Sequence, residues 1–221
     1  MHQPTQEHWT TVKRLLRYLK AIVGFSLFFS KHSTLDLQCF TDSDWGGCPD
    51  ESRSTNGYAI YLGKNLISWT SKKQPTIARF STESDYRALA NSTVEIMWLR
   101  SLLSELGFSS SNPTTLWCNN VGAIYLCSNP IFHARTKHIE LDYHFIWEQV
   151  QQRNIQVLFI SSDDQIVDIL TKPLGQRLFV KHRDKLRLCS SPPSAWWEVL
   201  EQQLDIVCFI CIYLIVVTII L

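Results

Sequence analysis

Alternation of apolar and polar positions predicts short strands in the first part of the chain. Residues 35–45 form the first of them, because Leu37 and Cys39 alternate with more polar neighbours in the period of a half-buried strand. Two further strands are expected over residues 55–62 and 66–71, joined by a tight link that begins with glycine. Links this short favour a three-stranded antiparallel meander.

Apolar residues spaced three and four apart predict helices along the rest of the chain. The expected helices cover residues 7–27, 81–107, 121–127, 139–152, 165–170 and 178–188. The second is the clearest, because residues 81–85 supply capping hydroxyls and first-turn acids and Gly107 stops it. Strands are expected over residues 114–118 and 155–160. A strand that runs into a helix, as the first of these does, is a β-α unit whose strand end commonly carries a site.

Two acids end the first strand. Asp42 and Asp44 lie one strand period apart, so both point to the same face, and Gly46 and Gly47 then let the backbone turn sharply. Carboxylate oxygens are ligands that Mg²⁺ accepts, so the pair is a candidate metal seat. The alternative is that Asp44 starts a turn and Asp42 is merely exposed.

The predicted helices contain further acids that are candidate site residues. Glu83 and Asp85 are two residues apart, so at most one of them can point with the strand acids. Asp168 sits among apolar residues, where an inward carboxylate is costly unless it is paired or bound to a metal; otherwise it faces solvent. His138 and Asp142 are spaced to bind a metal, although a surface ion pair is the stronger interpretation.

Composition narrows the class of protein. The 221 residues are 45% apolar and 19% charged, which suits one domain with appendages, and the net charge of +1 neither predicts nor excludes a nucleic-acid partner. The seven cysteines show no repeat and no signal peptide is recognisable, so reduced thiols and an intracellular, cytoplasmic or nuclear, location are expected.

The end of the chain has a different composition. Residues 206–221 carry no charge, and as a helix they would span about 24 Å, less than the ~30 Å of a hydrocarbon core. The segment is either a membrane tail anchor or sequence that is not normally translated. Residues 189–205 before it read as a linker.

Seven motifs in order resemble the ribonuclease H domain at the end of copia-type retrotransposon polyproteins. They are FTDSDWG (40–46), STNGY (54–58), ISWTSKKQP (67–75), STESDYRAL (81–89), WLR (98–100), FHARTKHIE (132–140) and DQIVDILTKP (164–173). The resemblance covers about residues 1–188. It divides them into a reverse transcriptase remnant (1–30), a ribonuclease H-like domain (31–173) and a basic C-terminal helix (174–188).

The resemblance implies an α/β fold: a mixed five-stranded sheet, three antiparallel strands then two parallel, flanked by helices. It also implies hydrolysis of the RNA strand of an RNA–DNA hybrid, with two Mg²⁺ ions held by four carboxylates. Such proteins read the A-form shape and the 2′-hydroxyls rather than the base sequence. The expected partners are the hybrid and the reverse transcriptase of the parent polyprotein.

Residue by residue, the resemblance maps the four catalytic positions onto Asp42, Asp85, Asn119 and Asp168. Two of them depart from the family pattern, which has glutamate at position 85 and aspartate at position 119. The shorter arm at 85 loses about 1.5 Å of reach, and the amide at 119 removes one negative charge. We therefore expect metal ligation by Asp42, Asp85 and Asp168 to be weakened, and cleavage to be slow or absent.

Basic side chains are the candidate contacts to nucleic acid. Lys72, Lys73, Arg79, Arg135 and Lys137 are expected to line the hybrid groove and contact phosphates. Two other hypotheses stay open. The chain is a non-catalytic nucleic-acid-binding remnant, or it is a membrane protein anchored by residues 206–221.

Overall fold

The computed structural model describes residues 3, 5–22, 24–27, 29–30, 33–108, 110, 112–129 and 139–190. The predicted tail, nearly all of the predicted linker and the loop with His138, Arg135 and Lys137 therefore lie outside the described residues. Among the helices that are described, none has the length and apolar character needed to cross a membrane.

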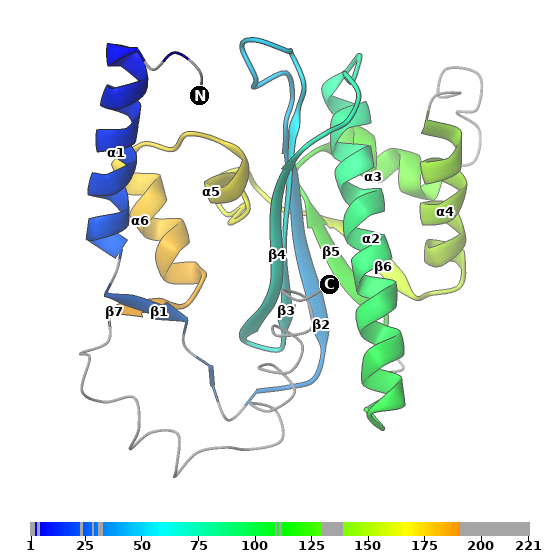
Figure 1. Cartoon of the computed structure of the whole chain (residues 1–221). Coiled ribbons are helices and arrows are strands. Elements are labelled where there is room, and N and C mark those ends of the chain that lie inside the picture. The colour runs from blue at the N-terminus through cyan, green and yellow to red at the C-terminus, as the bar shows by residue number, and fades with distance from the viewer. Residues whose placement is uncertain are drawn as a thin grey trace.

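A five-stranded mixed sheet forms the centre of the molecule (Figure 1). Its strands are β2 (Leu37–Asp44), β3 (Thr55–Leu62), β4 (Asn65–Lys73), β5 (Thr114–Cys118) and β6 (Ile155–Phe159), in the order β4-β3-β2-β5-β6. The β2–β3 and β3–β4 pairs are antiparallel, and the β2–β5 and β5–β6 pairs are parallel. The expected fold class, three antiparallel strands followed by two parallel ones, is confirmed.

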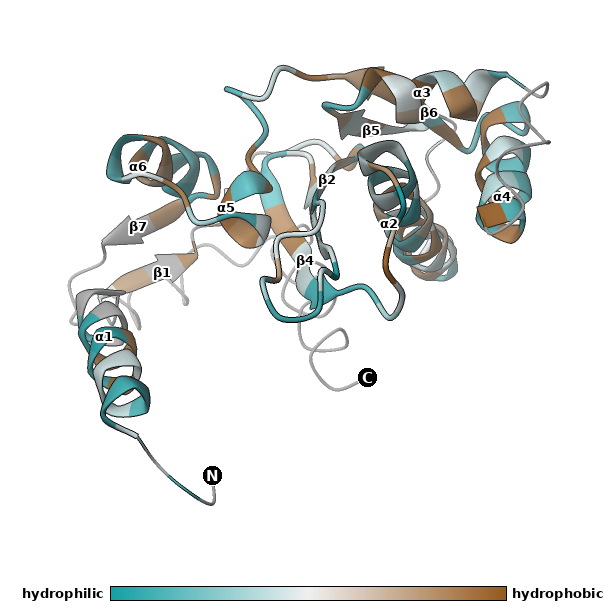
Figure 2. Cartoon of the chain, turned by 90° about the horizontal axis from the view of Figure 1, so that it is seen from above, coloured by the Kyte–Doolittle hydropathy of each residue, from teal (hydrophilic) through white to brown (hydrophobic). Residues whose placement is uncertain are grey.

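Helices cover both faces of this sheet. One face carries α2 (Ser81–Glu105), with α3 (Val121–Ser128) and α4 (Glu140–Gln151) beside it, and the other carries α5 (Asp168–Thr171) and α6 (Gln176–Lys185). Seen from above, α2 and α5 lie on opposite sides of β2 and β4 (Figure 2).

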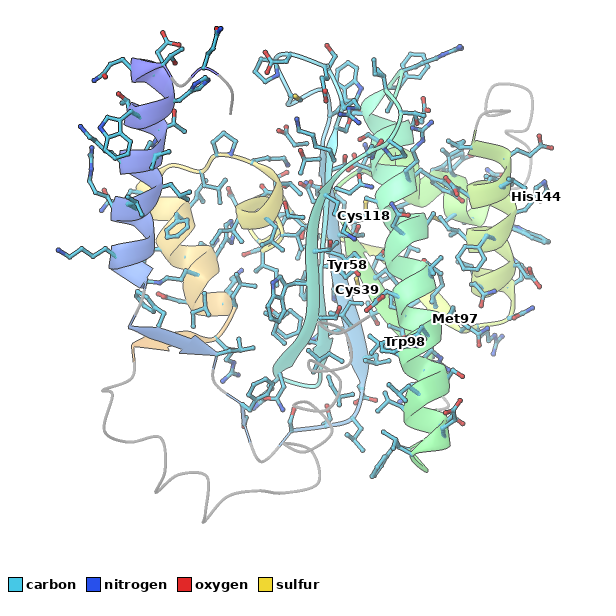
Figure 3. All side chains as sticks on the ribbon, viewed as in Figure 1. Cys39, Tyr58, Met97, Trp98, Cys118 and His144 are labelled. Atoms are coloured by element: carbon cyan, nitrogen blue, oxygen red, sulfur yellow. The ribbon has the colours of Figure 1, made fainter. Side chains whose placement is uncertain are left out.

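Strand alternation divides the core between the two faces. Cys39 and Tyr58, labelled in Figure 3, belong with Ile60 to the cluster that packs under α2. Ala59 and Tyr61, one residue out of phase with Ile60, belong to the second cluster on the other face. Alternate side chains of β3 therefore pack into the two different cores, so the strand is buried on both faces.

The helix starts differ in how they are capped. Asn120 accepts a hydrogen bond from the Ala123 backbone N–H (3.1 Å) and caps α3. The hydroxyl cap predicted for α2 is wrong, because its N-cap is Phe80 and no side chain of that residue bonds the helix. The Glu83 carboxylate instead accepts the Arg79 backbone N–H (2.9 Å).

The two ends of the described chain meet. The helix predicted to reach residue 27 ends earlier, as α1 (Gln6–Ile22), and is followed by β1 (Phe25–Leu27). β1 pairs antiparallel with β7 (Leu188–Ser190), which follows the basic helix α6. The Arg183 guanidinium also lies 4.9 Å from the centre of the Phe25 ring.

Gly57 lets the segment that ends in α5 approach the sheet closely. A Cβ atom added at Gly57 would lie 2.7 Å from Thr171 Cγ2 and 2.8 Å from Val167 Cγ1, closer than real contacts allow. Gly57 is also the cross-strand partner of Asp42. The glycine therefore determines how near Thr171 and its neighbours come to Asp42.

We expect Gly57→Ala to lower the free energy of unfolding by about 1–3 kcal/mol, because α5 must move away from β3. The measurement is urea unfolding of the full chain. Gly24→Ala is the matched control, since a Cβ there meets nothing within 4 Å. Equal midpoints for the two variants would contradict the proposed close contact.

A buried histidine lies in α6. His182 is only 1% exposed, and neither ring nitrogen has a hydrogen-bond partner among the described residues. Burial lowers the pKa of His182, and the nearby ammonium groups of Lys185 and Lys181 lower it further, against a weaker opposing effect of Asp164 and Asp163. The folded protein therefore holds this imidazole neutral.

Because the unfolded chain binds a proton at His182 more readily, stability should fall as the pH drops from about 6.5 towards the lowered folded value. We expect the urea midpoint of the wild type to fall relative to that of His182→Leu between pH 7.5 and 5.5, because the titration of the other groups, Asp85 among them, contributes equally to both proteins. His8→Leu, at an exposed position in α1, serves as the control and should keep the wild-type slope. The same slope in both variants would exclude His182 as its source.

Candidate functional site

Asp42 is the centre of the candidate site. It lies near the end of β2 with only 2% of its surface exposed, and both of its carboxylate oxygens have partners. Thr171 Oγ1 donates to Oδ2 (2.5 Å), and Lys172 Nζ donates to Oδ1 (3.0 Å). Both donors come from the segment that approaches the sheet at Gly57.

Lys172 joins two of the predicted acids. Its ammonium lies 3.0 Å from Asp42 Oδ1 and 3.0 Å from Asp168 Oδ1. Burial acts to lower the pKa of Lys172, but the two carboxylates outweigh it and hold that pKa above its ordinary value. The spacing of four residues from Asp168 was the available sequence signal for this pair, and the sequence analysis missed it.

Asp168 faces inward. Only 9% of the residue is exposed, which resolves the open alternative against a solvent-facing side chain. Burial raises the pKa of Asp168, and the neighbouring Asp42 carboxylate raises it further, while Lys172 acts in the opposite direction. The cost of this inward carboxylate is met by an ion pair within the chain.

Asp85 reaches the same region from the first turns of α2. Asn120 Nδ2 donates to its Oδ2 (2.7 Å), while its Oδ1 is buried without a hydrogen-bond partner among the described residues. Burial raises the pKa of Asp85 to about 7; the Asn120 bond opposes this rise and the Asp42 carboxylate adds to it. Glu83 points elsewhere, to Arg87 (2.7 Å), as the spacing predicts.

Asn119 follows directly on β5, next to the strand that carries Asp42. In the parallel register Phe40 pairs with Trp117, so Asp42 and Asn119 each lie two residues further along neighbouring strands. Asn119 is half-buried there. The backbone therefore places the amide at the same level of the sheet as Asp42.

Asp44 acts mainly in the turn after β2. Its carbonyl accepts the Gly47 N–H (3.3 Å), and its carboxylate lies where a side chain at Gly47 would stand. Burial raises the pKa of Asp44; Lys172 lowers it and Asp42 raises it, so the carboxylate still senses the site. This confirms one part of the alternative, that Asp44 starts a turn; the other part, an exposed Asp42, is wrong, because Asp42 is buried.

The fit of a metal ion differs between the two sides of Asp42. Within the described ranges, no three His, Cys, Asp or Glu side chains are arranged to hold a metal ion. On the Asp168 side, Lys172 already contacts both carboxylates. On the Asp85 side, a buried carboxylate oxygen lacks a partner, which is costly unless a cation completes it. Oxygens of Asp42, Asp85 and Asn119 suit Mg²⁺ there.

The predicted phosphate contacts are only partly described. Lys72, Lys73 and Arg79 are exposed near the end of β4 and the start of α2. Lys73 Nζ is engaged by Cys48 Sγ (3.1 Å) and by Glu51 (3.7 Å), so Lys72 and Arg79 are the more available of the three. Arg135 and Lys137 lie outside the described residues.

The strand order and the strand directions define a ribonuclease H-like fold. The chain belongs to the family of retrovirus-related Pol polyproteins from transposons. It is 49% identical over 194 residues to the Pol polyprotein from transposon RE2 of Arabidopsis thaliana and 37% identical over 189 residues to that from transposon TNT 1-94 of Nicotiana tabacum. These alignments cover 88% and 86% of this chain.

The chain spans only 13% and 14% of the length of these two relatives. No family model matches it. Among solved structures, a ribonuclease H1 isolated from compost is similar with a TM-score of 0.47 and 13% identity, covering 62% of this chain and 94% of that one. The fold assignment rests on the strand order and directions given above.

Asn120 links the cap of α3 to the Asp85 carboxylate. We expect Asn120→Ala to lower the free energy of unfolding at pH 8 by about 2–3 kcal/mol, through the lost cap and the lost bond to a buried carboxylate. Asn120→Ser keeps a capping oxygen and should recover about 1 kcal/mol of this loss. Urea unfolding measures both, and a serine variant no better than alanine would count against the capping role.

Proposed function

We propose that this chain is the ribonuclease H-like part of a transposon Pol polyprotein in which cleavage of RNA in RNA–DNA hybrids is weak or lost. The observation that carries the proposal is that Lys172 joins the acids of β2 and α5, Asp42 and Asp168, while the α2 acid Asp85 bonds Asn120 just after the neighbouring strand β5. Family membership supports the polyprotein context, with a reverse transcriptase as the partner domain.

Bound Mg²⁺ would activate a water molecule and stabilise the leaving oxygen of the cut phosphodiester. Asp42 and Asp85, with the amide of Asn119, are the groups we assign to hold it. Asn120 orients Asp85 through the bond to its Oδ2, and Thr171 orients Asp42 in the same way. Lys72 and Arg79 are exposed for phosphate contacts with the hybrid.

Two side chains account for the proposed loss of activity. Asn119 offers an oxygen but no charge, so the acids at positions 42, 85 and 168 supply −3 where the family pattern supplies −4. Asp85 is shorter than glutamate by one methylene, and a displacement of about 1 Å at a reacting centre costs about a hundredfold in rate. Both changes weaken the same site.

A second candidate is a nucleic-acid-binding module without chemistry. The exposed Lys72 and Arg79 favour it, because phosphate contacts need no metal. Hybrid affinity measured against salt concentration, in the absence of divalent ions, separates the two functions. A hybrid affinity that falls steeply with salt concentration, together with no cleavage after metal is added, would favour the non-catalytic binding module.

We expect the full chain carrying both Asn119→Asp and Asp85→Glu to cleave a labelled RNA–DNA hybrid at least tenfold faster than the unmodified chain, with Mg²⁺ or Mn²⁺. The restored charge and reach at the two positions are the physical reason. Asp50→Glu lengthens an exposed acid elsewhere and is the matched control. Equal rates for the unmodified chain and the double variant would falsify the proposed impairment.

A further inference from the structure

The two sides of Asp42 differ in a way that the proposed function does not explain. On one side the Lys172 ammonium contacts Asp42 and Asp168, and on the other a buried oxygen of Asp85 has no partner among the described residues. We propose that Lys172 takes the place of one of the two metal ions, so that this chain binds a single divalent cation between Asp42, Asp85 and Asn119. The proposal rests on the proposed function only for the kind of cation.

The position of Lys172 is the first argument. Its Nζ is equally distant, at 3.0 Å, from one oxygen of each carboxylate, which places a positive charge where an ion shared by Asp42 and Asp168 would lie. Two carboxylates this close to each other are stabilised by a shared proton or by a cation between them, and here the Lys172 ammonium contacts both. The lysine supplies that cation without a metal.

The backbone holds the lysine in place. Lys172 follows α5 with extended dihedral angles (φ −126°, ψ 148°), and the residue after it is Pro173. Proline disfavours helical dihedral angles in the residue before it, so the helix ends before Lys172. Its N–H still donates to the Asp168 carbonyl (2.9 Å), and Thr171 beside it bonds Asp42. The ammonium is therefore delivered to the acids from a restrained backbone.

Charge balance is the second argument. When all three are ionised, as metal binding requires, the acids at positions 42, 85 and 168 carry −3, and Lys172 reduces this to −2. That charge balances one divalent cation, whereas two such ions bring +4. Asn119 acts in the same direction, because it leaves the Asp85 side with oxygen ligands but without a third carboxylate.

The unpartnered oxygen identifies the side that still takes a metal. Asp85 Oδ1 is buried without a hydrogen-bond partner among the described residues, and Asn120 Nδ2 donates to the other oxygen at 2.7 Å. The register places Asn119 at the level of Asp42, and the next residue, Asn120, bonds Asp85, so the backbone brings the three groups to the same end of the sheet. These groups are hard oxygen donors, which suit Mg²⁺ or Mn²⁺.

The experiment counts Mn²⁺ ions bound to the full chain, by calorimetric titration together with electron paramagnetic resonance. We expect one Mn²⁺ for the wild type and for Lys172→Arg, and two for Lys172→Met, whose spectrum should show coupling between neighbouring ions. Lys64→Met removes an exposed lysine elsewhere and should bind one. Two ions in the wild type, none in the wild type, or one in Lys172→Met would overturn the proposal.

A second pair of variants keeps the test valid if Lys172→Met does not fold. We expect Asp85→Asn to weaken binding of the single Mn²⁺ at least tenfold, and Asp168→Asn to change it less than threefold, since Asp168 is assigned to the lysine. Equal weakening in both variants would contradict the assignment. Hybrid cleavage, measured on the same samples, tests the proposed function separately, because ion counts do not depend on turnover.

Discussion

The close approach of residues 167–172 to β3 is the contact on which the acidic site depends. Gly57 has no side chain to keep Val167 and Thr171 away, and it lies opposite Asp42 in the antiparallel register. The approach places Asp168 inside the molecule and brings Thr171 and Lys172 onto Asp42. One small residue on a strand therefore determines the surroundings of an acid on its neighbour.

Most of the fold was predictable because it follows from local patterns. The strands β2 to β6 begin and end within two residues of their predicted limits, since alternation and glycine turns mark them. The pairing of β1 with β7 was missed because strands of three residues show no periodicity and lie far apart in the chain. Their pairing makes residues 25–27 and 188–190 one structural element, which a division along the sequence separates.

The site was predictable only in part. The motifs locate Asp42, Asp85, Asn119 and Asp168 individually, but the sequence could not show what each side chain contacts. Lys172 four residues after Asp168 has the spacing of an ordinary surface pair, and it becomes half-buried against Asp42 where residues 167–172 approach Gly57. Likewise Asn119 and Asn120 are neighbours of the same type, yet the backbone gives Asn120 the cap and the bond to Asp85. Such outcomes depend on tertiary packing rather than on residue type.

Lys172 also bears on how this domain keeps its fold without a bound metal. Two unit charges about 4 Å apart interact by about 4 kcal/mol at an effective dielectric constant of about 20, which is comparable to the net stability of a small domain. Buried acids that relied on metal alone would lose that energy whenever the metal dissociated. A lysine within the chain provides this electrostatic interaction whether or not a metal is bound, with one positive charge instead of two. The ion pairs of Lys172 with Asp42 and Asp168 do not depend on the residue at position 119. Fold and catalysis can therefore be lost separately in this chain.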